Sequence, residues 1–265
     1  MAMKLAIVGA AGRMGKRLIA LAKEDPELDI GAAKECAGCP AMGQDAGLVA
    51  GVGELGVKIS ESLEGQMDCI MDFSSPQALP ETVDEARRRQ VPLVVGTTGL
   101  NAEHNAMLEQ ASCEIPLIAA PNYSVGVNLL FKIAEQVAWT LGDEYDAEII
   151  EIHHRFKVDA PSGTALGLAR AIASAREVNL EKVAIYGRQG KTGERPREQI
   201  GIHAVRAGDV VGEHTVIFSC LGERVELVHR AHTRDAFAQG ALRAAKFLMD
   251  GKPPGKYTMA QVLGF

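Results

Sequence analysis

The stretch Leu5-Ala6-Ile7-Val8-Gly9-Ala10-Ala11-Gly12-Arg13-Met14-Gly15 places an apolar run directly before three evenly spaced glycines. The run predicts a buried strand, and the amphipathic segment that follows it predicts a helix. A strand, a glycine turn and a helix in this order are typical of a dinucleotide-binding βαβ unit. Gly9 would allow the tight turn, Gly12 would let the backbone approach a pyrophosphate, and Gly15 would permit close packing of helix on strand. The stretch therefore predicts a Rossmann-type domain.

A carboxylate lies at the expected distance beyond this turn. Glu35 follows the second predicted strand, where it can accept hydrogen bonds from the adenosine ribose hydroxyls. Two further loops each follow a buried strand, and ligands of open α/β sheets bind at that strand end. We therefore expect an NAD(P) site, against the alternative of a glycine turn in a ligand-free protein. Its predicted residues are Gly9, Ala10, Ala11, Gly12, Arg13, Met14, Glu35, Gly96, Thr97, Thr98, Ala120, Pro121, Asn122 and Tyr123.

Short apolar runs alternate with helical segments through the first 125 residues. The further buried-strand candidates are residues 30–33, 69–73, 93–95 and 117–119, with helical segments around 81–89 and 103–111. This alternation predicts a parallel sheet covered on both faces. The expected fold class is α/β, with the dinucleotide-binding domain at residues 1–125.

The pattern changes in residues 126–234, which we expect to form a substrate-binding and oligomerisation domain. A helix is predicted at 128–141, a strand at 148–154 and a second helix at 162–175. The strand-like runs 200–205, 213–220 and 224–229 then follow, separated by turn-forming residues such as Gly208-Asp209 and Leu221-Gly222. We therefore expect an α+β domain with a mixed, largely antiparallel sheet. A last helix is predicted from Asp235 to about Leu248.

Composition narrows the classes of partner. The formal net charge of −6 disfavours nucleic acid or an anionic membrane. There is no apolar run near the length that spans a bilayer. Five cysteines without a signal peptide predict reduced thiols in the cytoplasm. The Cys36–Cys39 pair lacks a second pair of metal ligands, so we expect a loop and no metal site.

The segment from Glu151 to Ala165 carries the chemistry: Glu-Ile-His-His-Arg-Phe-Lys-Val-Asp-Ala-Pro-Ser-Gly-Thr-Ala. Adjacent side chains on an extended strand point to opposite faces, so His153 and His154 should have different roles. Ser162-Gly163-Thr164 would offer hydroxyls and free N–H groups at a helix N-terminus, which suits a carboxylate. Lys157 adds a positive charge nearby. Together these residues predict a pocket for a small carboxylate with a proton-transferring group, against the alternative of a polar strand end followed by an ordinary N-cap.

This segment resembles the signature of the 4-hydroxy-tetrahydrodipicolinate reductase family, the dihydrodipicolinate reductases of diaminopimelate and lysine biosynthesis. The similarity covers nearly the whole chain. Besides the glycine turn, it includes residues 72–74, 96–99, 122–128, 192–195, 206–214 and 222–224.

The resemblance implies a role for each matching position. His153 would be the catalytic acid/base and Lys157 a proton donor. The substrate carboxylates would be bound by His154, Lys157, Ser162, Gly163 and Thr164. The implied reaction is NAD(P)H-dependent reduction of 4-hydroxy-tetrahydrodipicolinate, through dihydrodipicolinate, to tetrahydrodipicolinate. The resemblance also implies a homotetramer and a C-terminal segment 235–265 that packs back onto the first domain.

One departure from the family bears on the cofactor. Members often carry an arginine directly after the ribose-binding glutamate, and here that position is Cys36. Lys34 would point away on an extended strand. Both NADH and NADPH stay possible, and the missing guanidinium favours NADH. Two other functions also stay open: a different small-substrate dehydrogenase, acting on an amino acid or semialdehyde, and a regulator that binds NAD(H) without chemistry.

Overall fold

The computed structural model describes residues 2–265, which form two compact units. One unit comprises the residues up to Ser124 together with Arg234–Phe265, and the other comprises Val125–Thr233. No helix within residues 2–265 is long and apolar enough to cross a membrane.

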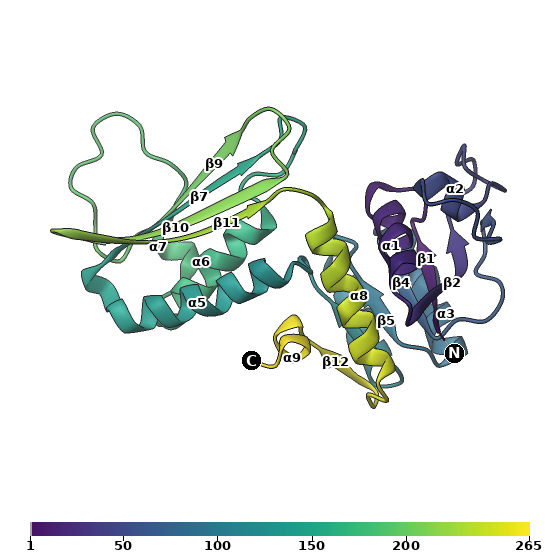
Figure 1. Ribbon diagram of the computed structural model, residues 1–265. Coiled ribbons are helices and arrows are strands. Elements are labelled where there is room, and N and C mark those ends of the chain that lie inside the picture. The colour runs from purple at the N-terminus through teal and green to yellow at the C-terminus, as the bar shows by residue number, and fades with distance from the viewer. Residues whose placement is uncertain (1) are drawn as a thin grey trace. The chain divides into compact units, whose positions relative to one another are not determined.

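The first unit contains a seven-stranded parallel sheet (Figure 1). Its strand order is β3 (Ile59–Ser60), β2 (Leu28–Lys34), β1 (Met3–Val8), β4 (Cys69–Asp72), β5 (Leu93–Val95), β6 (Pro116–Ala119) and β12 (Gly255–Tyr257). The chain thus winds outward from β1 in one direction and from β4 in the other. The point between these two strands is where ligands of doubly wound folds bind.

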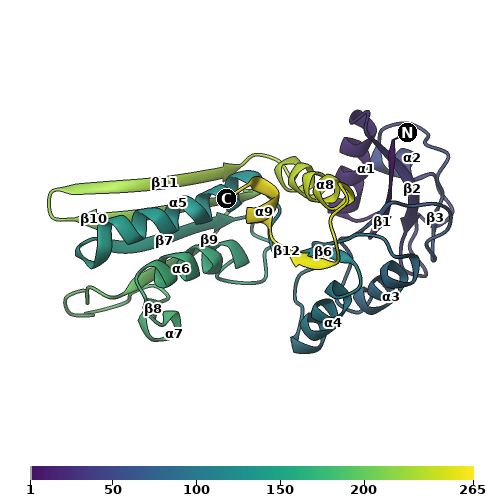
Figure 2. The ribbon, with the colours of Figure 1, turned by 90° about the horizontal axis from the view of Figure 1, so that it is seen from below.

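Helices cover both faces of this sheet, as Figure 2 shows from below. Leu5 and Ile7 of β1 pack with α1 (Arg13–Glu24) and α8 (Asp235–Met249), whereas Ala6 and Val8 pack with α3 (Leu79–Arg89) and α4 (Ala102–Ser112). Because successive side chains of a strand alternate between faces, a strand buried on both sides must be apolar throughout. The predicted parallel α/β sheet is confirmed. The remaining helices of this unit are the short α2 (Ala46–Ala50) and α9 (Met259–Leu263).

The second unit contains a five-stranded mixed sheet. Its order is β11 (Glu223–Ala231), β10 (Gly212–Cys220), β7 (Asp146–His153), β9 (Ile200–Arg206) and β8 (Ala184–Ile185). One face packs against α5 (Val125–Leu141) and α6 (Gly163–Ala175), and the connections include α7 (Leu180–Val183) and the 3₁₀ turn η1 (Gly142–Glu144). The predicted mixed sheet is confirmed.

The antiparallel share of this second sheet is smaller than the sequence suggests. β10 is antiparallel to β11 and β7, but β9 is parallel to both β7 and β8. The physical reason is the connection between β7 and β9, which runs through α6 and α7. A crossover of this kind returns the chain in the same direction, whereas a tight turn reverses it.

Helix α8 allows a test of how closely the C-terminal segment packs on the first unit. A Cβ on Gly240 would lie 1.7 Å from the carbonyl oxygen of Tyr123. We expect Gly240→Ala to lower the free energy of unfolding by about 1–3 kcal/mol, because overpacking outweighs the better helix propensity of alanine. Urea denaturation measures the change. The exposed neighbour Gln239 gives the control Gln239→Ala, and a Gly240→Ala protein as stable as that control would contradict the expectation.

Candidate functional site

The glycine turn after β1 is closed by backbone contacts that exclude side chains. Gly9 has a φ of 83°, and a Cβ on it would lie 2.5 Å from the carbonyl oxygen of Phe73. A Cβ on Gly15 would lie 2.2 Å from the carbonyl oxygen of Gly9. The first turn of α1 can therefore sit directly on the strand end, with its unpaired N–H groups at the surface of the turn.

A hollow of about 580 Å³ lies beside this turn. Glu35 forms part of its wall, and its Oε1 accepts a hydrogen bond of 3.0 Å from the N–H of Ala11, so the carboxylate is fixed to the glycine turn. Its Oε2 accepts a 3.1 Å bond from the N–H of Cys36. The hollow is lined by Val8, Gly9, Gly12, Lys34, Glu35, Cys36, Ala37, Glu61, Phe73, Ser74, Ser75, Ala78 and Glu81.

Lys34 is the basic residue of this hollow. Its side chain points toward α3, whereas the Glu35 carboxylate points toward the glycine turn, although both residues line the hollow. The ammonium group of Lys34 lies 2.6 Å from Glu81, and the side chain is nearly buried. The wall therefore carries three carboxylates, those of Glu35, Glu61 and Glu81, and one lysine that is already paired with one of them.

The loops after β4 and β5 are joined by the buried carboxylate of Asp72. Its Oδ1 accepts hydrogen bonds from the hydroxyls of Ser74 at 2.8 Å and Thr97 at 2.5 Å. Its Oδ2 is buried without a hydrogen-bond partner among the residues described. A Cβ on Gly96 would lie 2.0 Å from the ring of Phe73, so this loop also needs a glycine. A glycine cradle, the carboxylate of Glu35 beside it and polar loops at the same strand ends fit a pyridine nucleotide.

Not every residue predicted to bind the cofactor offers a free side chain. Tyr123 is buried, and its hydroxyl lies 2.7 Å from the carbonyl oxygen of Val95 and 3.1 Å from that of Ile118. Burial raises the pKa of Tyr123 above its ordinary value. Its side chain thus anchors the loop after β6 to the sheet and is not available to a ligand.

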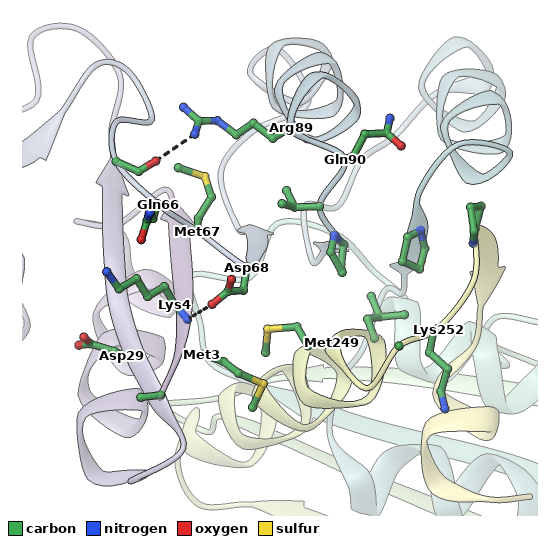
Figure 3. A pocket seen from close by; sticks show the side chains of 18 of the residues that line it. Met3, Lys4, Asp29, Gln66, Met67, Asp68, Arg89, Gln90, Met249 and Lys252 are labelled. Carbon is green, nitrogen blue, oxygen red and sulfur yellow. Dashed lines mark hydrogen bonds between the residues drawn. The ribbon is translucent and has the colours of Figure 1, made fainter.

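A larger hollow of about 1310 Å³ lies at the opposite ends of the same strands (Figure 3). Several of its polar groups are hydrogen-bonded within the protein. The Asp68 carboxylate accepts a 2.7 Å bond from the N–H of Lys4, and Arg89 donates to the carbonyl oxygens of Leu63 and Gly65. Because no predicted site residue lines it, this hollow is not part of the candidate site.

In the second unit, a cluster of polar side chains lies at the C-terminal end of β7. β7 alternates strictly, so Glu151 and His153 both point to the face covered by α5 and α6. The parallel register pairs His153 with Arg206 of β9. Glu151 is completely buried, and its carboxylate meets His153 Nδ1 at 2.5 Å and Arg206 at 2.8 and 2.9 Å. The end of the strand thus carries a carboxylate–histidine pair held by an arginine.

Burial and charge shift the pKa values of this pair. Burial alone would raise the pKa of the Glu151 carboxyl, but hydrogen bonds from Arg206 and His153 outweigh it and hold that pKa below its usual value. Burial lowers the pKa of His153, and the opposing contact with Glu151 does not restore it. His153 is therefore neutral at pH 7 in the absence of ligands.

Ser162 is the N-cap of α6 and is more heavily engaged than the sequence suggests. Its N–H donates to Glu151 Oε1 at 3.0 Å, and its hydroxyl oxygen accepts the N–H of Ala165 at 3.1 Å. The same hydroxyl lies 3.2 Å from Nε2 of His214, a histidine whose pKa burial lowers to about 3. Neutral His214 can accept the hydroxyl proton, so the polar atoms of Ser162 are used within the protein.

The other predicted substrate residues lie around this cluster. Lys157 donates a 2.8 Å hydrogen bond to Asp159 in the loop after β7. Gly163 and Thr164 begin α6, where the first N–H groups have no intrahelical acceptors. The Nδ1 atom of His154 is buried without a partner among the residues described. The structure thus brings both histidines, Lys157 and the start of α6 to one end of the second unit.

Sequence reasoning missed four residues of these two sites: Asp72, Glu151, Arg206 and His214. For Glu151 a signal was present, because residues two apart on a strand share a face. Arg206 and His214 come from other strands. Their proximity to His153 depends on strand register, which the sequence does not reveal.

Comparison with known proteins agrees with this geometry. Residues 3–123 match the family described as "Dihydrodipicolinate reductase, N-terminus", and residues 126–263 match "Dihydrodipicolinate reductase, C-terminus". A 4-hydroxy-tetrahydrodipicolinate reductase of Magnetococcus marinus is 50% identical over 100% of both chains. One of Alkalilimnicola ehrlichii is 49% identical, also over 100% of both.

A solved structure shares the fold. The dipicolinate-bound dihydrodipicolinate reductase of Paenisporosarcina sp. TG-14 has a TM-score of 0.75 and 24% sequence identity, covering 98% of this chain and 99% of its own. Two family matches that together span nearly all residues, and relatives of about half identity over full length, settle the assignment. The chain belongs to the dihydrodipicolinate reductase family.

Proposed function

We propose that this protein reduces 4-hydroxy-tetrahydrodipicolinate to tetrahydrodipicolinate with NADH, in diaminopimelate and lysine biosynthesis. The observation that carries the proposal is the Glu151–His153 pair beside Lys157 and the start of α6, in a chain half identical to reductases of that name. A small-substrate dehydrogenase of another kind would not need this cluster. A regulator without chemistry would not need an acid/base histidine.

The substrate carries two carboxylates, and the second unit offers groups that bind them. We assign this role to Lys157, His154 and the N-terminal backbone of α6 at Gly163 and Thr164. The dihydrodipicolinate reductase of Paenisporosarcina holds dipicolinate, a ring with two carboxylates. Ser162 contributes by capping the helix and holding Glu151, since its polar atoms are already engaged.

The reaction requires loss of the 4-hydroxyl as water, followed by addition of one hydride and one proton to the unsaturated ring. The reduced nicotinamide supplies the hydride when bound. His153 delivers the proton, aided by the positive charge of Lys157, and the negative charge that develops on the ring is thereby relieved. Because neutral His153 must first gain a proton, the two substrate carboxylates have a second effect: they raise its pKa in the complex.

The wall of the hollow beside Glu35 supports NADH over NADPH. A 2′-phosphate would face the carboxylates of Glu35, Glu61 and Glu81, and the one lysine present is paired with Glu81. Among the described residues, no arginine lines the hollow. The cost of bringing like charges together without a bidentate partner therefore favours the cofactor with a free ribose hydroxyl.

We also propose that the enzyme acts in the cytoplasm as a homotetramer. Among the described residues no helix packs on the second face of this sheet, and Val205 and Val228 of that face are more than a third exposed. Exposed apolar side chains on an open sheet face suit association with further copies of the chain.

Replacing His153 by alanine tests the proton donor. We expect a loss of about 10²–10⁴ in kcat with little change in NADH affinity, since a positioned acid contributes a factor of that order. Lys157→Ala should reduce kcat and raise the KM for the substrate together. Oxidation of NADH, followed with the condensation product of pyruvate and aspartate semialdehyde, measures both. Full activity of His153→Ala would contradict the role of His153 as proton donor.

The shifted pKa of His153 predicts different pH profiles for kcat/KM and kcat. The protonated imidazole is the active form, and the pKa of the free enzyme lies below the ordinary value of 6.5. We therefore expect kcat/KM to fall with rising pH at a lower pH than kcat, which reports the substrate complex with its raised pKa. Rate measurements from pH 5 to 9 show the decline of each parameter. If kcat/KM and kcat declined at the same pH, this assignment would be contradicted.

The cofactor proposal is tested with both nucleotides. We expect kcat/KM to be higher with NADH than with NADPH. Cys36→Arg should raise kcat/KM for NADPH by about tenfold, since a charge-assisted hydrogen bond to phosphate contributes about 1.5–3 kcal/mol. Cys113→Arg adds the same charge at an exposed position outside the hollow and serves as the control. An equal gain in both variants would indicate a general charge effect.

A further inference from the structure

The carboxylate of Glu151 is saturated with hydrogen-bond donors. Oε1 accepts from the N–H of Ser162 at 3.0 Å and from Arg206 Nη2 at 2.9 Å. Oε2 accepts from Arg206 Nη1 at 2.8 Å and contacts His153 Nδ1 at 2.5 Å. A carboxylate with its charge retained accepts at every one of these positions and donates at none.

This donor set fixes the proton on the His153 ring. An arginine stays protonated, and a backbone N–H can only donate. The contact at 2.5 Å is therefore a hydrogen bond only if His153 carries a hydrogen on Nδ1. In the neutral ring the other nitrogen, Nε2, then has the free lone pair.

The surroundings of Nε2 leave that atom available. Among the described residues no hydrogen bond to Nε2 of His153 is formed, and its neighbour on β10 is Gly212. A Cβ on Gly212 would lie 3.1 Å from Nε2. The ring of His214 stands edge-on at 5.2 Å between centroids, which limits rotation of the imidazole.

We propose that Glu151 is the positioning residue of the reaction: with Arg206 it holds His153 in the Nδ1–H tautomer, so that Nε2 exchanges the proton with the substrate. The catalytic meaning of this assignment rests on the proposed function. The tautomer itself does not, because it follows from contacts within the protein.

The first test is the tautomer of the wild-type enzyme. Long-range ¹H–¹⁵N spectra of protein labelled at histidine distinguish a protonated Nδ1 from a protonated Nε2. His153→Gln identifies the His153 signals by their loss. We expect a protonated Nδ1 and an unprotonated Nε2 above the pKa of the ring. A protonated Nε2 in the wild-type enzyme overturns the proposal.

The second test is Glu151→Gln, which keeps the shape of the side chain. In this variant the amide nitrogen can take the place of either carboxylate oxygen. In place of Oε1 it would face two donors, Ser162 and Arg206. In place of Oε2 it faces Arg206 and the His153 ring, and the ring can move its hydrogen to the other nitrogen. The amide therefore donates to Nδ1, and His153 switches to the Nε2–H tautomer. We expect the spectra to show this switch. We also expect kcat to fall about 10²-fold while the KM for the substrate changes less than about threefold.

Glu148→Gln is the matched control. Glu148 lies on the same strand, points to the opposite face, and is bound by Arg188, Arg195 and His203. This variant removes a similar ion pair but leaves the His153 signals and kcat near wild type. Equal loss of kcat in both variants, or an unchanged His153 tautomer in Glu151→Gln, overturns the proposal.

Misfolding of the variant and failure of the proposed function can each be distinguished from failure of the tautomer assignment. If Glu151→Gln does not fold, the wild-type spectrum still decides the assignment. If the wild-type enzyme does not oxidise NADH with the proposed substrate, the proposed function fails while the tautomer measurement keeps its meaning.

Discussion

A buried carboxylate needs hydrogen-bond donors from the protein in place of the water it has lost. In the second unit, Glu151 is the carboxylate that imposes this requirement. Removing an ion from water costs several kcal/mol unless partners replace the lost solvation. The partners come from three elements: Ser162 from the start of α6, Arg206 from β9 and His153 from β7 itself. Satisfying one charge therefore aligns the helix and the two strands that meet at this cluster.

The first unit follows a different constraint, which is the two-sided burial of a parallel sheet. With helices on both faces, only the strand ends are open to ligands. The glycine turn, Glu35 and the Asp72-linked loops all lie at the carboxyl ends of their strands. Polar groups that would destabilise the core are thus confined to the edge where a nucleotide needs them.

Sequence pattern was sufficient for the main strands and helices of both units, but it did not predict the short elements β3, β8, β12, α2, α7 and α9. Apolar runs such as residues 5–8 predicted the buried strands, and the segment around His153 predicted a polar cluster, which lies at the end of β7. The sequence pattern did not reveal the register between neighbouring strands. The parallel return of β9, which puts Arg206 next to His153, depends on a crossover whose direction no local signal encodes. Ser162 looked like a ligand-binding hydroxyl because its engagement with His214 comes from another strand.

The pairing of β12 with β6 has a consequence for biosynthesis. Residues 255–257 complete an edge of a sheet whose other strands all lie within the first 119 residues. During translation the ribosome must therefore release the whole second unit before that edge is covered and α8 can seal its face of the sheet. In the meantime the nascent chain exposes an unpaired strand and apolar surface, the two features that recruit chaperones to growing polypeptides.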